Sequence, residues 1–334
     1  MTIGLGWLRT INDCQELILA SDSRLNGGPV FDQCPKMQCL PREDCAMCFA
    51  GDTIFAYPMM MQAGFSIGEF DNITTRAMPI EDLRGAVLKS INTLNSSISF
   101  QNICVVDPNF EMRSETEFVF GGYSWIEKQF KIWKIVFDNH NKRFVCKKFK
   151  FEKNGKPCIC MIGDREAKNA FASELAQVLR KSYGQPFPNT PSQIANLRNF
   201  ESFHQWDLEP FDALCNLLKK RNKPSTIGGS PQMVKVYQYM NSKPVGVFWP
   251  NLISGSNENR TLLGRKMQSY EKSRYWFIDP DTHISYPGSS VVMVAKNKGQ
   301  STYSRFDRAL LIKEFLTAIH NLYQKKKSEY DIRD

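Results

Sequence analysis

Short apolar runs separated by polar turns fill the first fifty residues of the chain. The runs Ile3 to Leu8 and Glu16 to Ser21 flank the polar stretch Thr10 to Asp13, and this pattern predicts a β-hairpin. A third apolar run begins after Lys36, and a fourth spans Cys45 to Ala50. The pattern therefore predicts a group of neighbouring strands at the start of the chain.

Helical spacing follows these strands. The run Thr53 to Ser66 is apolar on most sides, which predicts a buried helix that Pro58 interrupts early. A second helix is predicted to open at Pro79, because proline and the acidic residues after it suit a helix N-terminus. Apolar residues then recur at helical spacing, at Leu83, Val87, Ile91 and Leu94.

The middle of the chain predicts more strands and then helices. Four strand candidates are Glu117 to Phe120, Phe130 to Phe137, Arg143 to Phe151 and Pro157 to Ile162. Gly121-Gly122 is expected to break the chain between the first two. The elements predicted next are a helix from Glu166 to Tyr183, a helical run within His204 to Lys220, and a strand from Met233 to Tyr239.

The last part of the chain has a different character from about Pro250 onward. Asn251 to Glu271 is polar, which predicts a loop or an insertion. A strand pair is predicted at Arg274 to Ile278 and Ser290 to Ala295, followed by an amphipathic helix from Phe306 to Tyr323.

Three polar side chains fall at the ends or starts of the first strands, and together they suggest a nucleophile. Threonine is small enough for aminopeptidases to remove the preceding Met1, which would leave Thr2 with a free α-amine. That amine has an ordinary pKa near 8, against about 10 for a lysine amine. A neighbouring Lys36 would lower it further, and Asp22 would hold Lys36 in place. The set predicts Thr2 as the nucleophile, with its own amine as the base.

These residues resemble those of a known family. Met-Thr-Ile, then Ala-Ser-Asp-Ser-Arg, a lysine and Phe-Ala-Gly-Asp are similar to the pattern of proteasome β-type subunits and their bacterial relatives, HslV and the Anbu group. The resemblance is tight over residues 2 to 55. It implies an N-terminal-nucleophile (Ntn) hydrolase with an α+β fold, a four-layer αββα sandwich. It also implies catalytic roles for Thr2, Asp22 and Lys36, and an oxyanion contact from the backbone N–H of Gly51.

The same resemblance implies further properties and shows some departures. It implies a homo-oligomer, either a dimer or a ring, and an Ntn-hydrolase domain over residues 1–249 with a C-terminal extension over 250–334. The family carries a supporting serine at the junction where Asp164 stands here. Pro224 and Ile227 occupy positions where the family has another aspartate and serine.

Supporting and substrate-binding roles are predicted for Ser21, Arg24 and Asp164. Ser21 could donate a hydrogen bond to the amine or to Asp22, and Arg24 directly follows the Asp22-Ser23 pair. The residues that line the substrate cleft are expected to come from Arg24 to Asp32 and from Gly51 to Phe55.

Charge is divided unevenly along the 334 residues. Residues 1–140 hold 11 basic and 17 acidic side chains, a net charge of −6, whereas residues 141–334 hold 32 basic and 17 acidic side chains, a net charge of +15. A basic half could meet nucleic acid, an acidic substrate or the acidic half of a neighbouring subunit. Nucleic-acid binding is not expected, because no aromatic-basic module is visible.

Composition excludes other classes. The chain lacks a run of eighteen apolar residues and a secretory signal, so no membrane contact is expected. Ten scattered cysteines fit a reducing cytoplasm. Cys45 and Cys48 form a C-x-x-C pair within a predicted strand, where their side chains would point to opposite faces, so no metal site is expected. No phosphate-binding or dinucleotide motif is present, and no cofactor is expected.

These observations predict a threonine-type hydrolase that cleaves amide bonds in peptides or proteins after loss of Met1. Two alternatives stay open at the level of the sequence. One is a small-molecule amidase with the same fold, because this fold accommodates many acyl donors. The other is a pseudoenzyme that acts as a scaffold or binding module through its basic half, since the accessory positions 224 and 227 depart from the family.

Overall fold

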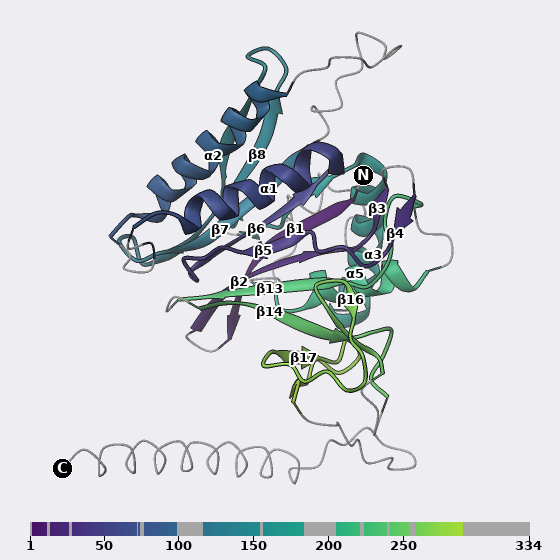
Figure 1. The fold of residues 1–334 in the computed structure, drawn as a ribbon. Coiled ribbons are helices and arrows are strands. Elements are labelled where there is room, and N and C mark those ends of the chain that lie inside the picture. The colour runs from purple at the N-terminus through teal and green to yellow at the C-terminus, as the bar shows by residue number, and fades with distance from the viewer. Residues whose placement is uncertain are drawn as a thin grey trace, which may run out of the picture. The chain divides into compact units, whose positions relative to one another are not determined.

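The structure of the chain, a computed structural model, describes residues 2–11, 14–26, 29–71, 73, 77–98, 116–153, 156–183, 205–220, 224–238, 241–253 and 258–289. Within them the protein is mixed α/β, which is consistent with the predicted α+β class (Figure 1). Contacts along the chain divide it into one unit of Met1–Val292 and another of Met293–Asp334. The first of these units contains all of the elements described below.

The predicted N-terminal hairpin is confirmed. Strand β1 (Ile3–Ile11) pairs antiparallel with β2 (Cys14–Ser21), and Gly4 lies opposite Ser21. Both strands run further toward the turn than the apolar pattern predicts. This register brings the residue before β1 close to the residue after β2, which are Thr2 and Asp22.

The hairpin belongs to a nine-stranded sheet. Its main path runs β12-β1-β2-β13-β14-β15-β16, and β17 pairs with β14 and with β18. The strands that join the hairpin are β12 (Cys160–Gly163), β13 (Gln232–Tyr237), β14 (Asn241–Phe248), β15 (Arg260–Leu262), β16 (Arg265–Lys266), β17 (Trp276–Ile278) and β18 (Ser285–Pro287). Strands β1, β2 and β13 lie next to one another, so side chains from three distant parts of the sequence meet at one end of this sheet.

A second sheet has five strands in the order β5-β6-β7-β8-β9. They are β5 (Met37–Cys39), β6 (Cys45–Ala50), β7 (Glu117–Ser124), β8 (Gln129–Asp138) and β9 (Arg143–Phe149). The prediction that Gly121-Gly122 breaks the chain is wrong, because both glycines lie inside β7. A Cβ at Gly121 would come within 2.7 Å of Leu17 Cδ2, and one at Gly122 within 2.6 Å of the Asp44 carbonyl oxygen. The glycines therefore allow close packing against both faces of this central strand.

Four helices accompany the sheets in the described residues: α1 (Thr53–Gly68), α2 (Ile80–Ser97), α3 (Arg165–Tyr183) and α5 (Glu209–Lys219). The expected interruption at Pro58 is absent, because α1 continues through it. Pro58 lacks the N–H that would bond to the carbonyl of Ile54. Both residues are exposed, so water can hydrate that carbonyl without breaking the helix.

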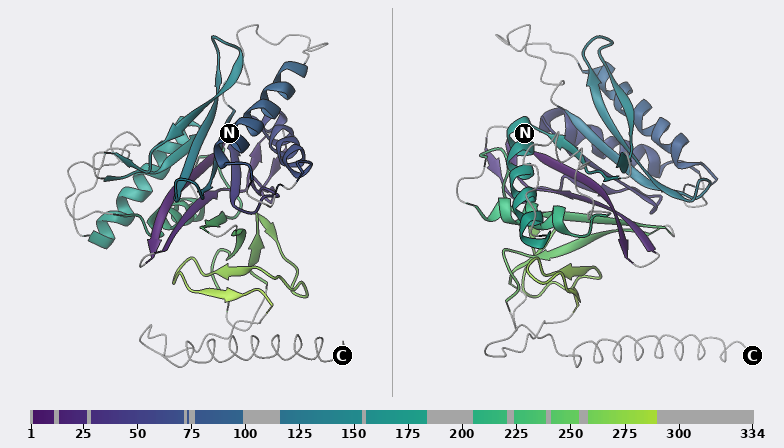
Figure 2. Two further views of the ribbon diagram at one scale, coloured as in Figure 1. Left: turned by 90° about the vertical axis from the view of Figure 1, so that its left-hand side faces the viewer. Right: turned by 180° about the vertical axis from the view of Figure 1, so that it is seen from behind.

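Figure 1 and Figure 2 show how the helices and strands are arranged. Three clusters of buried apolar side chains connect these elements. One joins α1 and α2 to the five-stranded sheet, through residues such as Met59, Leu83 and Phe118. Another joins α3 and α5 to β1, β2 and β13 of the nine-stranded sheet. The third draws on both sheets, with Leu19 and Val234 from one and Val119 and Ile132 from the other. Met59 and Met60 are buried in the first cluster.

The segment after residue 249 contains more strands than its polar composition predicts. Strands β15 and β16 lie within the stretch predicted as a loop, and β17 pairs with β14 and β18. The predicted strand at 290–295 and the helix at 306–323 lie outside the described residues. The domain boundary between 249 and 250 stays a prediction.

Candidate functional site

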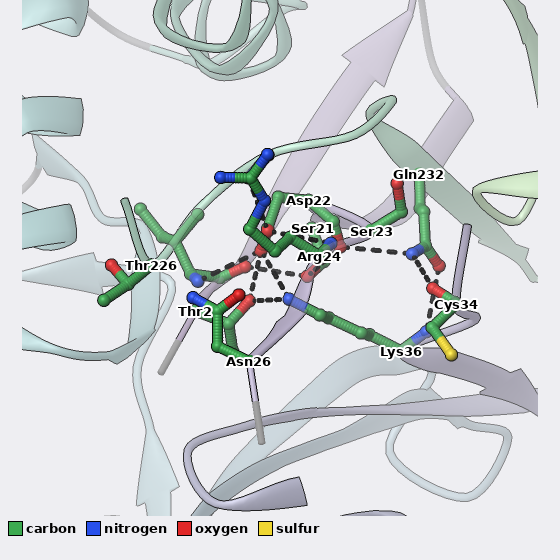
Figure 3. Close-up of polar contacts among 12 residues, drawn as sticks. Thr2, Ser21, Asp22, Ser23, Arg24, Asn26, Cys34, Lys36, Thr226 and Gln232 are labelled. Atoms are coloured by element: carbon green, nitrogen blue, oxygen red, sulfur yellow. Dashed lines mark hydrogen bonds and ion pairs between the residues drawn. The ribbon is translucent and has the colours of Figure 1, made fainter. Parts of the chain in front are cut away.

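Thr2, Asp22 and Lys36 meet in one hydrogen-bonded group. Thr2 precedes β1, Asp22 follows β2 and Lys36 precedes β5. The Thr2 hydroxyl donates to Asp22 Oδ1, and Lys36 Nζ donates both to Thr2 Oγ1 and to Asp22 Oδ1, the latter over 2.9 Å (Figure 3). The three residues that the strand pattern predicts for a nucleophilic site are therefore in mutual contact.

Burial gives this group unusual electrostatics. Thr2 is 2% exposed, and Asp22 and Lys36 are 0% exposed. Burial lowers the pKa of the Lys36 ammonium, and the charge and hydrogen bond of Asp22 act in the opposite direction. A lysine in this environment releases a proton more readily than one in water, which suits a group that tunes a neighbouring acid or base.

The Asp22 carboxylate is held from both sides. Oδ1 accepts from Thr2 and Lys36, and also from the N–H of Ile3 at 3.4 Å. Oδ2 accepts from the N–H of Arg24 at 3.1 Å and from that of Gly228 at 3.0 Å. Five donors therefore fix both oxygens, and hydrogen bonds of this kind stabilise the anion.

Two glycines allow a distant loop to supply one of these donors. A Cβ at Gly228 would overlap the Arg24 guanidinium, and one at Gly229 would overlap Ser23 Oγ and the Asp32 carbonyl oxygen. Gly229 also has a φ of 70°, which glycine adopts without strain. The sequence pattern does not predict that the N–H of Gly228 binds Asp22.

Ser21 and Arg24 both lie beside the group without touching the Thr2 hydroxyl. Ser21 Oγ donates to the carbonyl oxygen of Ile3 at 2.7 Å and to that of Asp22 at 3.1 Å. The Arg24 guanidinium forms a bidentate pair with Asp32, with distances of 2.6 and 2.9 Å. Ser21, the last residue of β2, therefore bonds to the start of β1. Arg24 stabilises the segment after β2 through its pair with Asp32.

Asp164 contacts Thr2 through its backbone. Its N–H donates to the Thr2 carbonyl oxygen over 3.3 Å. Its carboxylate accepts from the N–H of Ala167 at 2.7 Å, in the first turn of α3, and from Thr226 Oγ1 at 3.1 Å. The aspartate thus caps a helix, and Thr226 connects it to the loop that leads to Gly228.

Gly51 lies between β6 and the first turn of α1. It has a φ of 109°, and the next residue, Asp52, caps α1 by accepting from the N–H of Ile54 at 2.8 Å. Phe49, two residues earlier, donates its N–H to the Lys36 carbonyl oxygen at 3.1 Å, so this strand end runs beside the start of β5. The expected oxyanion contact from Gly51 stays a prediction.

The described part of the chain contains no group of three or more histidine, cysteine, aspartate or glutamate side chains placed to hold a metal. Burial raises the pKa of Cys39 to about 11 and that of Cys160 to about 12.

Among the described helices, none has the length and apolar character needed to cross a membrane.

Comparison with known proteins gives distant structural neighbours. No protein-family model matches the chain, and no curated protein matches it. Solved structures that are similar to it include a mutant of Anbu from Hyphomicrobium sp. strain MC1, with 13% identity, a TM-score of 0.46, and coverage of 73% of this chain and 87% of that chain. Anbu (ancestral beta-subunit) from Yersinia bercovieri has 10% identity, a TM-score of 0.44, and coverage of 73% and 86%.

Proposed function

We propose that the protein is an N-terminal threonine hydrolase that cleaves amide bonds in peptides or proteins once Met1 has been removed. The observation that carries the proposal is the position of Lys36 Nζ, which donates to both Thr2 Oγ1 and Asp22 Oδ1. The positive charge of Lys36 Nζ, which donates to Oγ1, favours removal of the hydroxyl proton by a neighbouring base. In this proposal, the two sheets and their flanking helices form the four-layer αββα sandwich of the Ntn hydrolases.

The proposed reaction uses the first residue as both nucleophile and base. As long as Met1 is attached, the nitrogen of Thr2 is a peptide amide and cannot accept a proton. Once Met1 is removed, the free amine takes the Thr2 hydroxyl proton while Oγ1 attacks the substrate carbonyl carbon. The C–O bond forms, and the negative charge moves to the carbonyl oxygen, where the N–H of Gly51 would stabilise it.

The intermediate then collapses and the amide C–N bond breaks. The leaving nitrogen takes the proton from the Thr2 amine, and the acyl group stays on Oγ1 as an ester. Water attacks that ester with the same amine as base, releasing the acid and restoring the hydroxyl. Asp22 holds Lys36 Nζ through Oδ1 throughout, because five hydrogen bonds fix its two oxygens.

The test is intact mass and N-terminal sequencing of the purified protein, with and without an epoxyketone or β-lactone that reacts with N-terminal threonine. The expected result is a chain that starts at Thr2 and gains one inhibitor mass. Thr2→Ala is the matched control, because alanine also permits removal of Met1 but has no hydroxyl, and it should not gain mass. Lys36→Ala should also lose the label.

Two other outcomes separate the alternatives. Wild-type protein that keeps Met1, or starts at Thr2 and never labels, would favour a pseudoenzyme that binds partners through its basic half. Protein that labels but hydrolyses small amides and no peptides would be an amidase. Cytoplasmic location, assembly into a dimer or ring, and the substrate-binding role of the segments 24–32 and 51–55 belong to the same proposal.

A further inference from the structure

Gln232 is a buried polar residue next to the proposed site. It is the first residue of β13 and is 0% exposed. Its Nε2 donates to the Cys34 carbonyl oxygen at 2.7 Å and to the Asp22 carbonyl oxygen at 3.1 Å. Its Oε1 accepts from the backbone N–H of Lys36 at 3.0 Å (Figure 3). One side chain therefore bonds the main chain on both sides of position 35 and also at Asp22.

The sheet explains why Gln232 reaches these groups. Strand β13 pairs antiparallel with β2, and Gln232 lies opposite Ser21, the residue before Asp22. Successive side chains of a strand alternate between faces, so Gln232 shares a face with Val234 and Val236. Those valines belong to the cluster that draws on both sheets, which is the cluster that also contains Met37, next to Lys36.

The amide group suits this position better than other side chains of similar size. A primary amide offers two N–H donors and a carbonyl acceptor, and the three backbone groups here require two donors and one acceptor. A methionine would fill similar space without any of these bonds. A glutamate would keep the acceptor for Lys36, but when ionised it would place a second oxygen against two carbonyl oxygens.

We propose that Gln232 is a positioning residue that sets the separation of the main chain at Asp22 from that at Lys36, and so holds Lys36 Nζ at Thr2 Oγ1. The inference rests on the proposed hydrolase function. Gln232 touches neither the Thr2 hydroxyl nor the Lys36 ammonium, so it acts only through the backbone that carries these groups. Small displacements of reacting groups have large effects on rate, which makes this role measurable.

The experiment measures labelling of Thr2 by an epoxyketone, with its maximal rate kinact and its half-saturating concentration KI, across a range of pH. Gln232→Met should lower kinact by about 100-fold with KI unchanged, because the reacting groups move while the surface that binds the inhibitor is left intact. Val236→Ala is the matched control. It removes buried methyl groups from the same strand and face, so it should lower the melting temperature and leave kinact unchanged.

Gln232→Glu gives a second, independent readout. When protonated, its carboxyl group keeps one donor and the acceptor for Lys36, so the ratio of its kinact to that of wild type should be highest at low pH. The ratio should fall as that carboxyl group ionises. Folding differences between the proteins would not produce this pH profile, and the variant decides the question if Gln232→Met does not fold.

Several results would overturn the inference. For Gln232→Met, they are a kinact equal to that of the wild type, a kinact no lower than that of Val236→Ala, or a change in KI alone. For Gln232→Glu, the contrary result is a kinact ratio to wild type that does not vary with pH. Wild-type protein that starts at Thr2 and does not label would overturn the proposed function, and this inference with it. The two failures are therefore distinguished by the wild-type arm.

Discussion

Glu117 in the five-stranded sheet accepts a hydrogen bond of 2.8 Å from the backbone N–H of Gly163 in the nine-stranded sheet. Gly163 lies opposite Ile3 in the pairing of β1 with β12, and Ile3 directly follows Thr2. The carboxylate also pairs with Lys134 Nζ at 2.6 Å. The Glu117 side chain thus connects the two sheets near the start of β1, next to the proposed nucleophile Thr2.

Removing the Glu117 side chain should destabilise the protein. Glu117→Ala leaves the N–H of Gly163 without its partner, which should cost about 1–3 kcal/mol of unfolding free energy. Glu117→Gln keeps an oxygen for that N–H and weakens only the partly exposed ion pair, for about 0–1 kcal/mol. Urea denaturation of both variants and the wild type measures the difference. Equal losses in the two variants would show that the bond to Gly163 contributes nothing.

Gly163→Ala should destabilise the protein and disturb the position of Thr2. Gly163 has a φ of 112°, and a Cβ there would overlap the Thr2 carbonyl oxygen. The backbone strain alone costs about 1–3 kcal/mol, and the overlap must displace Thr2 or β12 as well. Labelling of Thr2 by an epoxyketone should therefore fall together with stability.

Gly85→Ala is the control for that change. Gly85 lies in α2, and a Cβ there meets nothing within 4 Å, so alanine should stabilise the protein by about 0.5–1 kcal/mol. Thermal unfolding of the two variants should move in opposite directions. A Gly163→Ala variant with wild-type stability would contradict the tight packing of this junction.

Charge balance in the site gives a third prediction. Lys36→Met should cost about 3–5 kcal/mol, because it leaves the fully buried Asp22 carboxylate without its cation. The double variant Asp22→Asn with Lys36→Met removes both charges and should be more stable than Lys36→Met alone. Neither should label at Thr2. Denaturation curves in which the double variant is the less stable protein would contradict this.

A pH effect is expected away from the site. His283 Nε2 lies 2.5 Å from Asp212 Oδ1 on α5, and the hydrogen bond to Asp212 raises the pKa of His283 above 6.5 although partial burial opposes it. The protonated histidine therefore stabilises the folded state fully below pH 6.5, and this contribution is lost as pH rises through the folded-state pKa. The pair is partly exposed, so its size should be under about 1 kcal/mol.

The measurement is unfolding free energy as a function of pH for wild type, His283→Gln and Asp212→Asn. Asp207 and Arg9 also act on His283, Asp207 raising and Arg9 lowering its pKa, and both residues are unchanged in these variants. Both substitutions should remove the same part of the pH dependence. A wild-type profile that is unaltered by either one would show that the contact is not formed in solution.

Strand and helix positions follow closely from the apolar pattern, and the errors have local causes. Gly121 and Gly122 favour a break by composition, but neighbouring side chains from Leu17 and Ile80 occupy the space that a Cβ would need. Strand β14 is not predicted because Pro244 and Gly246 weaken a strand pattern. Its partner explains the glycine, since the Phe277 ring packs where a Cβ at Gly246 would lie.

The residues of the candidate site likewise fall into those that the sequence predicts and those that it does not. Thr2, Asp22 and Lys36 could be predicted to meet, because each stands at the end of a strand whose neighbours are recognisable from the sequence. Gln232 and Gly228 could not, because they lie 196 and 206 residues from Lys36 and Asp22 and approach them only through the pairing of β13 with β2. Gln232 binds main-chain atoms and Gly228 contributes its own main-chain N–H, so neither contact leaves a pattern of side chains in the sequence.

The buried ion pair of Asp22 and Lys36 has a consequence for how the proposed site becomes active. As an ion pair, Asp22 and Lys36 cancel, so the surroundings of the Thr2 hydroxyl are electrically neutral while Met1 is attached. In the proposed enzyme, removal of Met1 frees the α-amine of Thr2. This amine is the one basic group that the cleavage adds to these neutral surroundings. Maturation of the chain and arming of its chemistry would then be one and the same bond cleavage.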